Sequence, residues 1–230
     1  MQQLLLPGFA TSPAQTIENF MTGGNLELVE TLRGLTSGAV RERFFYLWGE
    51  TGSGKSHLLQ GVVSAARQRG TSAIYTHVPE EYPDIQLVAF DDADLLDESA
   101  QIALFNLYNR LREGDGCLVA SGTLPPAQLA VRPDLATRLG WGLVFRVHSL
   151  SDEEKAAALA THAELRGFTL PGDVSGYLLR HWRRDLPSLM AVLEALDRYS
   201  MERRRAINVP LLKELLEKHQ GNAEQVKLNA

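Results

Sequence analysis

Short apolar runs alternate with amphipathic segments over roughly the first two thirds of the chain. Five runs have the length of strands, each followed by polar or turn-forming residues: 44–48, 73–77, 86–90, 117–121 and 143–147. Between several of them apolar residues recur at helical spacing, as Leu58, Leu59, Val62 and Val63 do. Strands that alternate with helices predict a mostly parallel sheet with helices on both faces. We therefore expect an α/β domain over residues 16–150.

The pattern changes after residue 150, where strand-like runs stop and an Ala/Leu-rich helical pattern begins. Ser151 and Glu154 form an S-x-x-E capping box, which marks a helix start. Asp185 is a suitable N-cap, and Pro187 is tolerated in the first turn that follows it. The expected helices are 153–166, 173–182, 186–204 and 210–218. The sequence predicts a small all-helical domain over 151–230, with a polar, frayed tail from residue 221.

A glycine-rich motif directly follows the first strand and satisfies the pattern GxxxxGK[ST]. Its residues are Gly49, Glu50, Thr51, Gly52, Ser53, Gly54, Lys55 and Ser56. Glycines let backbone N–H groups close around phosphates, Lys55 reaches the β/γ oxygens and Ser56 binds Mg²⁺. His57 belongs to the same nucleotide-binding segment, where packing or exposure suits it better than a role as a base. A turn without function is the alternative, but the strand before and the helix after the loop favour ADP or ATP with Mg²⁺.

The strand 86–90 ends in two acids, Asp91 and Asp92. Asp91 would hold Mg²⁺, directly or through water, and Asp92 would polarise the attacking water. Many strands end in acids for solubility alone, but the distance from the glycine-rich motif favours the catalytic interpretation. Asp92 is one methylene shorter than glutamate, so we expect slow hydrolysis. Asp94 and Asp97, which continue the acidic run, are interpreted as turn and helix-cap residues.

Composition narrows the classes of function. The chain has 230 residues, 44% of them hydrophobic, which is enough for a folded core. Its one cysteine, Cys117, excludes an internal disulfide and a cysteine metal site. No apolar run approaches the roughly 20 residues of a membrane span, and no basic secretory start is present, so we expect a cytoplasmic protein with no membrane partner. The net charge of −5 argues against nucleic-acid binding through an overall positive field.

Several segments together resemble the AAA+ module of the bacterial replication initiator DnaA and, more closely, the shorter Hda family, the regulatory inactivators of DnaA. The segments that carry the resemblance are 16–20, 44–56, 121–126, 135–142 and 166–171. The Arg-Leu-Gly-Trp-Gly signature within 135–142 is specific to this clade, whereas the glycine-rich motif is shared by many unrelated NTPases. Similarity covers nearly the whole chain.

The resemblance assigns roles to three further residues. It implies that Arg138 is an arginine finger that enters a neighbouring subunit's nucleotide site, where its guanidinium would bind γ-phosphate oxygens. A salt bridge with Asp134, one turn earlier, is the alternative. Thr123 stands at the family's sensor position after the fourth strand and can hydrogen-bond a water or a phosphate. Pro187 stands where the family's lid sensor has an arginine, so we expect weak or no intrinsic ATPase activity.

Residues 1–15 resemble a clamp-binding peptide followed by a linker. The matching residues are Gln3, Leu4, Leu6, Pro7 and Phe9. They are similar to the Gln-Leu-x-Leu-Pro-Leu peptide by which Hda proteins bind the β sliding clamp of DNA polymerase III. Gly8 replaces the last leucine, so Phe9 would fill that apolar pocket. A back-packed or disordered apolar terminus is the alternative.

The resemblance implies a negative regulator of replication initiation that docks on the DNA-loaded clamp and stimulates hydrolysis of DnaA-bound ATP. Its partners would be DnaA and the clamp, with a homo-oligomer through the AAA+ interface as a further option. Too few residues follow the lid for a helix-turn-helix domain, so we expect DNA contact only indirectly through the clamp. A self-sufficient, helicase-loader-like ATPase and a clamp-binding scaffold without nucleotide are the competing hypotheses.

Overall fold

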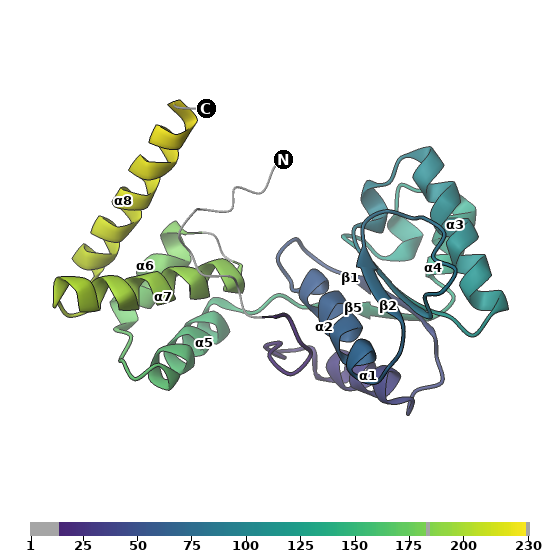
Figure 1. Cartoon of the computed structure of the whole chain (residues 1–230), viewed down its shortest axis with the longest axis horizontal. Helices are drawn as coiled ribbons and strands as arrows, with labels where there is room; N and C mark the ends of the chain where they lie inside the picture. The colour runs from purple at the N-terminus through teal and green to yellow at the C-terminus, as the bar shows by residue number, and fades with distance from the viewer. Residues whose placement is uncertain (1–13, 183–184, 229–230) are drawn as a thin grey trace. The chain divides into compact units, whose positions relative to one another are not determined.

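The computed structural model describes residues 14–182 and 185–228, with side chains described as far as Lys218 (Figure 1). The chain divides into two compact units. The first comprises residues 14–150, and the second begins at Ser151.

The first unit is built on a five-stranded sheet with the order β2-β3-β4-β1-β5. Its strands are β1 (Phe44–Trp48), β2 (Ala73–Thr76), β3 (Leu87–Phe90), β4 (Cys117–Gly122) and β5 (Leu143–Arg146). Every neighbouring pair is parallel, and Tyr46 is aligned with Ala120 on one side and Val144 on the other. The five strands predicted from the apolar runs are confirmed, with ends that differ by at most one residue.

Helices cover both faces of this sheet (Figure 1). Helices α1 (Leu26–Ser37) and α2 (Lys55–Gln68) cover one face, and α3 (Glu98–Glu113) and α4 (Pro133–Leu139) cover the other. The short 3-10 turns are η1 (Ala93–Leu95) and η2 (Pro126–Gln128). Side chains alternate along β1, so that Phe45 and Leu47 pack with α1 and α2 while Phe44 and Tyr46 pack with α3 and α4. Burial on both faces explains why the strands are continuous apolar runs.

All the regular secondary structure among the described residues of the second unit is helical. It contains α5 (Asp152–Leu165), α6 (Gly172–His181), α7 (Leu186–Arg203) and α8 (Val209–Leu228). The capping box is present, because the Ser151 hydroxyl accepts from the Glu154 N–H and the Glu154 carboxylate accepts from the Ser151 N–H. Asp185 caps α7 by accepting from the Ser188 N–H at 3.0 Å.

One prediction for this unit is wrong. Helix α8 continues to Leu228, whereas the sequence predicted a helix that ends at 218 and a frayed tail from 221. The segment after Gly221 contains alanine, glutamate, glutamine and lysine and no proline, and these residues have good helix propensity despite their polarity. No helix among the described residues is long and apolar enough to cross a membrane.

Candidate functional site

The glycine-rich loop connects the end of β1 to the start of α2. Gly52 and Gly54 have φ angles of 84° and 102°, a region that glycine adopts without steric cost. A Cβ on Gly54 would lie 2.6 Å from the Phe20 ring, so the loop also leaves no room there. Helix α2 begins at Lys55, and its first N–H groups face the loop, which makes this end of the helix suited to an anion.

Lys55 lies inside this loop. Its side chain is buried, and the amine donates to the carbonyls of Gly49 at 2.7 Å and Glu50 at 3.0 Å. Burial lowers the pKa of Lys55, and the nearby carboxylates of Asp91, Asp92 and Asp94 oppose that shift. The amine is therefore held between loop carbonyls and the acids of the next strand.

Two acids, Asp91 and Asp92, lie at the end of β3 near Lys55 of the glycine-rich motif. Asp91 is buried, and its carboxylate accepts from the Ser121 hydroxyl and, at 2.7 Å, from the Tyr75 hydroxyl. Asp92 adopts the left-handed conformation, with a φ of 57°, and its side chain is partly exposed. Burial, and then the charge of Asp91, raises the pKa of Asp92.

The residues in this region fit a nucleotide with a divalent cation. The Ser53 hydroxyl oxygen is buried without a hydrogen-bond partner, which suits a loop shaped for a ligand. Ser56 and Asp91 remain the residues that could hold Mg²⁺, because both supply the oxygen ligands that this ion prefers.

His77 is a site residue that the sequence reasoning missed. Its Nδ1 lies 3.4 Å from an Asp92 carboxylate oxygen, and its Nε2 lies 3.2 Å from the Tyr75 hydroxyl. Ligand atoms of His77, Asp91 and Asp92 all lie within 4.8 Å of one another, as a divalent cation would require. The sequence signal that could have identified His77 was its position at the end of a strand-like run. The carboxyl ends of parallel strands meet at one edge of a sheet, so His77 could be expected beside Asp91 and Asp92.

Asp94 has a second role beyond the turn that the sequence predicted. It lies in η1, as expected, but its carboxylate also accepts from the Thr123 backbone N–H at 3.1 Å and from the Thr123 hydroxyl. Thr123, which carries no charge of its own, is thus hydrogen-bonded to an acid from another element. Asp97 caps α3 by accepting from the Ala100 N–H at 2.8 Å, which confirms its interpretation as a cap.

His57 faces the N-terminal segment of this unit. Its Nε2 lies 2.9 Å from the Thr16 carbonyl and 2.8 Å from the Asn19 carboxamide oxygen, and its ring lies edge-on to Phe20. Burial lowers its pKa. The segment 16–20 therefore covers the first turn of α2, and His57 is the residue that joins them.

Arg138 lies away from these acids, in the last turn of α4. Its guanidinium carbon is 4.0 Å from the centre of the Trp141 ring. The alternative salt bridge with Asp134 does not form, because the Asp134 carboxylate pairs with Arg132 at 2.9 Å. Among the residues that the structure describes, no carboxylate pairs with Arg138. The guanidinium lines an open hollow of about 380 Å³ together with Asn109, Arg112 and Glu113.

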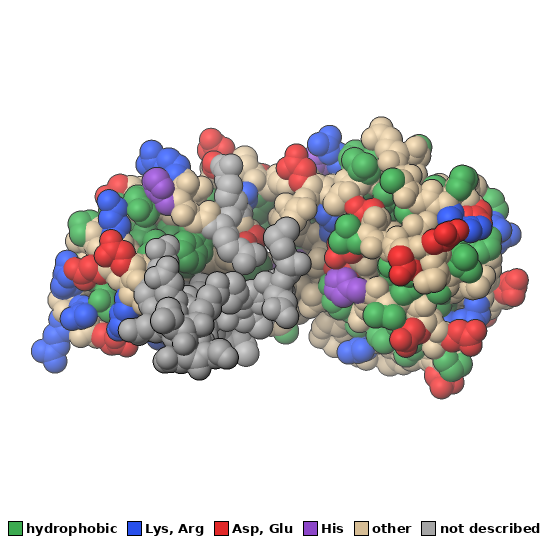
Figure 2. Space-filling model, turned by 90° about the horizontal axis from the view of Figure 1, so that it is seen from above, with side chains coloured by type: hydrophobic (Ala, Val, Ile, Leu, Met, Phe, Trp, Pro, Cys, Tyr) green, Lys and Arg blue, Asp and Glu red, His purple; other side chains and the backbone are tan. Residues whose placement is uncertain are grey.

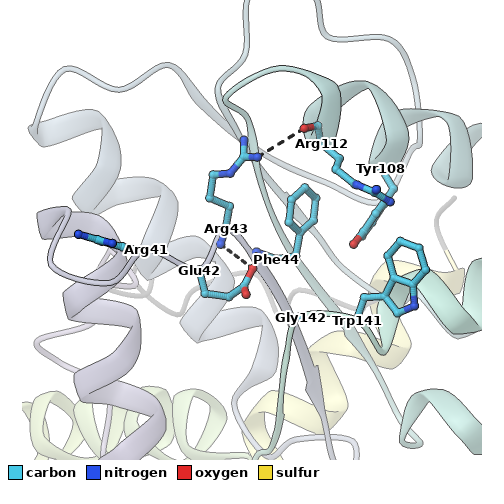
Figure 3. Close-up of a pocket in the computed structure, with 8 residues that line it drawn as sticks. All are labelled: Arg41, Glu42, Arg43, Phe44, Tyr108, Arg112, Trp141 and Gly142. Carbon is cyan, nitrogen blue, oxygen red and sulfur yellow. Dashed lines mark hydrogen bonds between the residues drawn. The ribbon is translucent and has the colours of Figure 1, made fainter.

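Arg138, Arg112 and Trp141 form a surface that we call the arginine face. A second hollow, of about 260 Å³, adjoins it (Figure 3). Phe44, Tyr108, Arg112 and Trp141 line it from one side, while Arg43 donates to the carbonyls of Gly114 and Gly116 beyond the end of α3. It adjoins the first residue of β1, whereas the glycine-rich loop follows the last. The five residues of β1, at about 3.3 Å each, separate the two regions.

One group of predicted residues lies outside the described part of the chain, namely the clamp-peptide residues Gln3, Leu4, Leu6, Pro7 and Phe9. Among the described residues on the face shown in Figure 2, acidic and basic side chains are interspersed within each unit.

Comparison with known proteins adds a family match in the helical unit. Residues 152–216 match the family model described as Hda, lid domain. Domain III of the Thermotoga maritima replication initiation protein DnaA is 19% identical with a TM-score of 0.74, covering 91% of this chain and 98% of that one. The replication initiator DnaA bound to AMPPCP and single-stranded DNA is 22% identical with a TM-score of 0.68, covering 80% and 65%. The Thermotoga maritima RuvB Holliday junction branch migration motor is 13% identical with a TM-score of 0.64, covering 90% and 72%.

These structures share the AAA+ fold with the chain, and the predicted architecture of a P-loop α/β core followed by a helical lid is thereby confirmed. The chain spans only 65% of the length of the nucleotide-bound DnaA structure. Residues 152–216 thus match the lid of the Hda family, and the chain shares its fold with the DnaA structures.

Proposed function

We propose that this chain is a negative regulator of replication initiation, which stimulates the hydrolysis of ATP bound to DnaA by supplying Arg138. The observation that carries the proposal is the state of Arg138: its guanidinium lines an open hollow and pairs with no carboxylate among the described residues. A guanidinium in that state can meet the anionic oxygens of a nucleotide held by another protein. The Hda lid match supports DnaA as that protein.

The chain's own nucleotide, ADP or ATP with Mg²⁺, would bind at Gly49–Ser56. Backbone N–H groups of the loop and the Lys55 amine would hold the phosphates, and Ser56 and Asp91 would hold the cation. When bound, the nucleotide supplies the negative charge that Lys55 and the first turn of α2 are arranged to accept. Pro187 lies in the first turn of α7, where the resemblance places an arginine, so this nucleotide serves mainly as an anchor.

The test is the hydrolysis of DnaA-bound ATP in the presence of clamp, DNA and this protein. Arg138→Ala should lower the stimulated rate by about 10³-fold, the low end for an arginine finger. Arg132→Ala is the matched control, because Arg132, directly before α4, is also a partly exposed arginine but is already paired with Asp134. Stimulation that persists after Arg138→Ala would overturn the proposal.

Clamp docking is a separate part of the proposal and rests on the sequence of residues 3–9. Leu4→Ala with Leu6→Ala should abolish binding to the immobilised β clamp and leave nucleotide binding unchanged. Unchanged clamp binding would remove this part of the proposal without touching the role of Arg138.

A self-sufficient ATPase is the second candidate, favoured by the grouping of His77, Asp91 and Asp92 at the loop. It predicts steady turnover without DnaA or clamp, at about 1 s⁻¹ or faster, abolished by Lys55→Ala. We expect turnover far below that rate. A scaffold that needs no nucleotide would instead tolerate Lys55→Ala in the DnaA assay.

A further inference from the structure

Trp141 is a large aromatic residue at the protein surface, with 55% of its area exposed. Single exposed apolar residues are common and need no explanation. Trp141 differs because two guanidinium groups lie over its ring, with carbon-to-centroid distances of 4.0 Å for Arg138 and 4.9 Å for Arg112. The indole is therefore a contact surface for two cations.

The backbone around Trp141 is fixed by close contact with β1. A Cβ on Gly142 would lie 1.9 Å from the Phe44 carbonyl oxygen, so only glycine allows this approach. The backbone N–H of Trp141 donates to the Arg138 carbonyl at 3.2 Å. This hydrogen bond joins the Trp141 backbone to the last turn of α4. The contact with β1 and the end of α4 thus determine where the indole lies, and it lies beside Arg138.

The chemistry of this contact suits an arginine that must act on another molecule. An unrestrained arginine has many rotamers, and each binding event must select one of them. A carboxylate partner would restrict the side chain but would also neutralise its charge. An aromatic ring restricts it through cation–π attraction and leaves the N–H donors of the guanidinium edge available. Phe105, at 5.5 Å from the Arg138 guanidinium carbon, adds a second aromatic contact.

We propose that Trp141 is a positioning residue for Arg138, which holds the guanidinium in an ordered, charged and accessible state for a partner's nucleotide. This inference rests on the proposed function, because it assigns a role to Trp141 in the same step.

A first experiment tests the contact without DnaA. In NMR spectra of protein with ¹³C-labelled arginine, ring current should shift the Arg138 δ-methylene protons upfield. Trp141→Leu should remove most of that shift and leave the smaller contributions of Phe105 and Tyr108, whereas Trp141→Phe should retain more of it. Arg146, which lies over Trp48 at 5.3 Å, is an internal control whose shifts should not change. Arg138 signals that are the same in Trp141→Leu and in the unchanged protein would overturn the inference.

A second experiment separates positioning from binding in the DnaA assay. Trp141→Leu should lower the maximal stimulated rate by about 2- to 5-fold, the range that corresponds to one cation–π contact at an exposed site. The concentration of this protein that gives half-maximal stimulation should not change. Trp141→Phe should recover most of the rate, and Trp141→Leu should add nothing to Arg138→Ala.

The outcomes distinguish the two proposals. If Arg138→Ala has no effect, the proposed function itself fails. If Arg138→Ala abolishes stimulation while Trp141→Leu leaves the maximal rate unchanged, the finger role stands and the positioning role of Trp141 fails. A Trp141→Leu effect confined to the half-maximal concentration would make Trp141 a docking residue and would also overturn the inference.

Discussion

The glycine-rich loop and the arginine face lie in the same α/β unit but differ in whether their charged side chains have hydrogen-bond or ion-pair partners within the fold. At the loop, Lys55 donates to carbonyls of its own loop, and Asp91 is bonded to Ser121 and Tyr75. At the arginine face, Arg138 and Arg112 share an exposed ring, and Arg138 has no carboxylate partner among the described residues. The loop's charges thus have partners within the fold. Arg138, although Glu113 lines the same hollow, is not paired with it, and this difference underlies our proposal that Arg138 meets an anion of another molecule.

The strongest test of this contrast is the effect of each cation on nucleotide binding. Lys55→Ala should weaken binding of a fluorescent ADP analogue by about 100-fold, because a charged donor to the phosphates is lost. Arg138→Ala should leave the Kd within about 2-fold, since Arg138 lies beyond the opposite end of β1. Equal weakening by the two substitutions would show that both regions serve one site.

The next largest effect concerns the backbone that supports the arginine face. Gly142→Ala should lower the free energy of unfolding by about 2–3 kcal/mol, because the added Cβ meets the Phe44 carbonyl. Gly140→Ala is the matched control two residues earlier, where a Cβ would meet nothing closer than 3.5 Å. Urea denaturation should show that control unchanged or more stable by up to about 1 kcal/mol. A Gly142→Ala protein as stable as the control would show that β1 and the Trp141 backbone are not held as close as the structure has them.

The contact between Asp94 and Thr123 should give a smaller effect at the loop side. In a double-mutant cycle, Asp94→Asn and Thr123→Val should couple by about 1 kcal/mol in the free energy of unfolding, because the Thr123 hydroxyl donates to the Asp94 carboxylate. The hydrogen bond from the Thr123 backbone N–H is kept in Thr123→Val. Asp97→Asn, combined with Thr123→Val, should be additive, since Asp97 caps its own helix. Additivity in both cycles would show that Asp94 and Thr123 do not interact in the folded protein.

The smallest expected effect is the pH dependence due to Asp92. Its pKa is raised in the folded protein, so the stability that it contributes at low pH is lost as pH rises through that pKa. Asp92→Asn should therefore raise the Tm near pH 7.5 by about 1–2 °C, and this gain should shrink on acidification. Thermal melts followed by circular dichroism measure it. A gain that grows as pH falls would mean that the carboxylate is stabilised in the fold.

Sequence reasoning was accurate where the signal is local. The strands were found because each is a short apolar run with turn-forming residues at its ends, and the caps at Ser151, Asp97 and Asp185 were found because a cap acts within three residues. Local propensity also accounts for the error at α8, where polarity was interpreted as fraying although the residues favour helix.

Contacts between distant residues were beyond that reasoning. His77 meets Asp92 only because β2 and β3 are neighbours, and Asp94 meets Thr123 because β3 and β4 are neighbours. Spacing alone allowed Asp134 to pair with Arg138. The fold paired Asp134 with Arg132 and placed Trp141 beside Arg138 instead.

The sequence by itself determined the α/β core, the helical unit after residue 150, the glycine-rich loop and the identity of the residues that could act. These depend on periodicity, glycine positions and capping, which are properties of neighbouring residues. Only the tertiary structure decided which charged side chains have partners within the fold. Strand order brings His77 and Asp94 to the loop, and the approach of Gly142 to β1 leaves Arg138 on an aromatic ring rather than on an acid. That difference is the basis for our proposal that Lys55 serves the chain's own ligand and Arg138 a partner's.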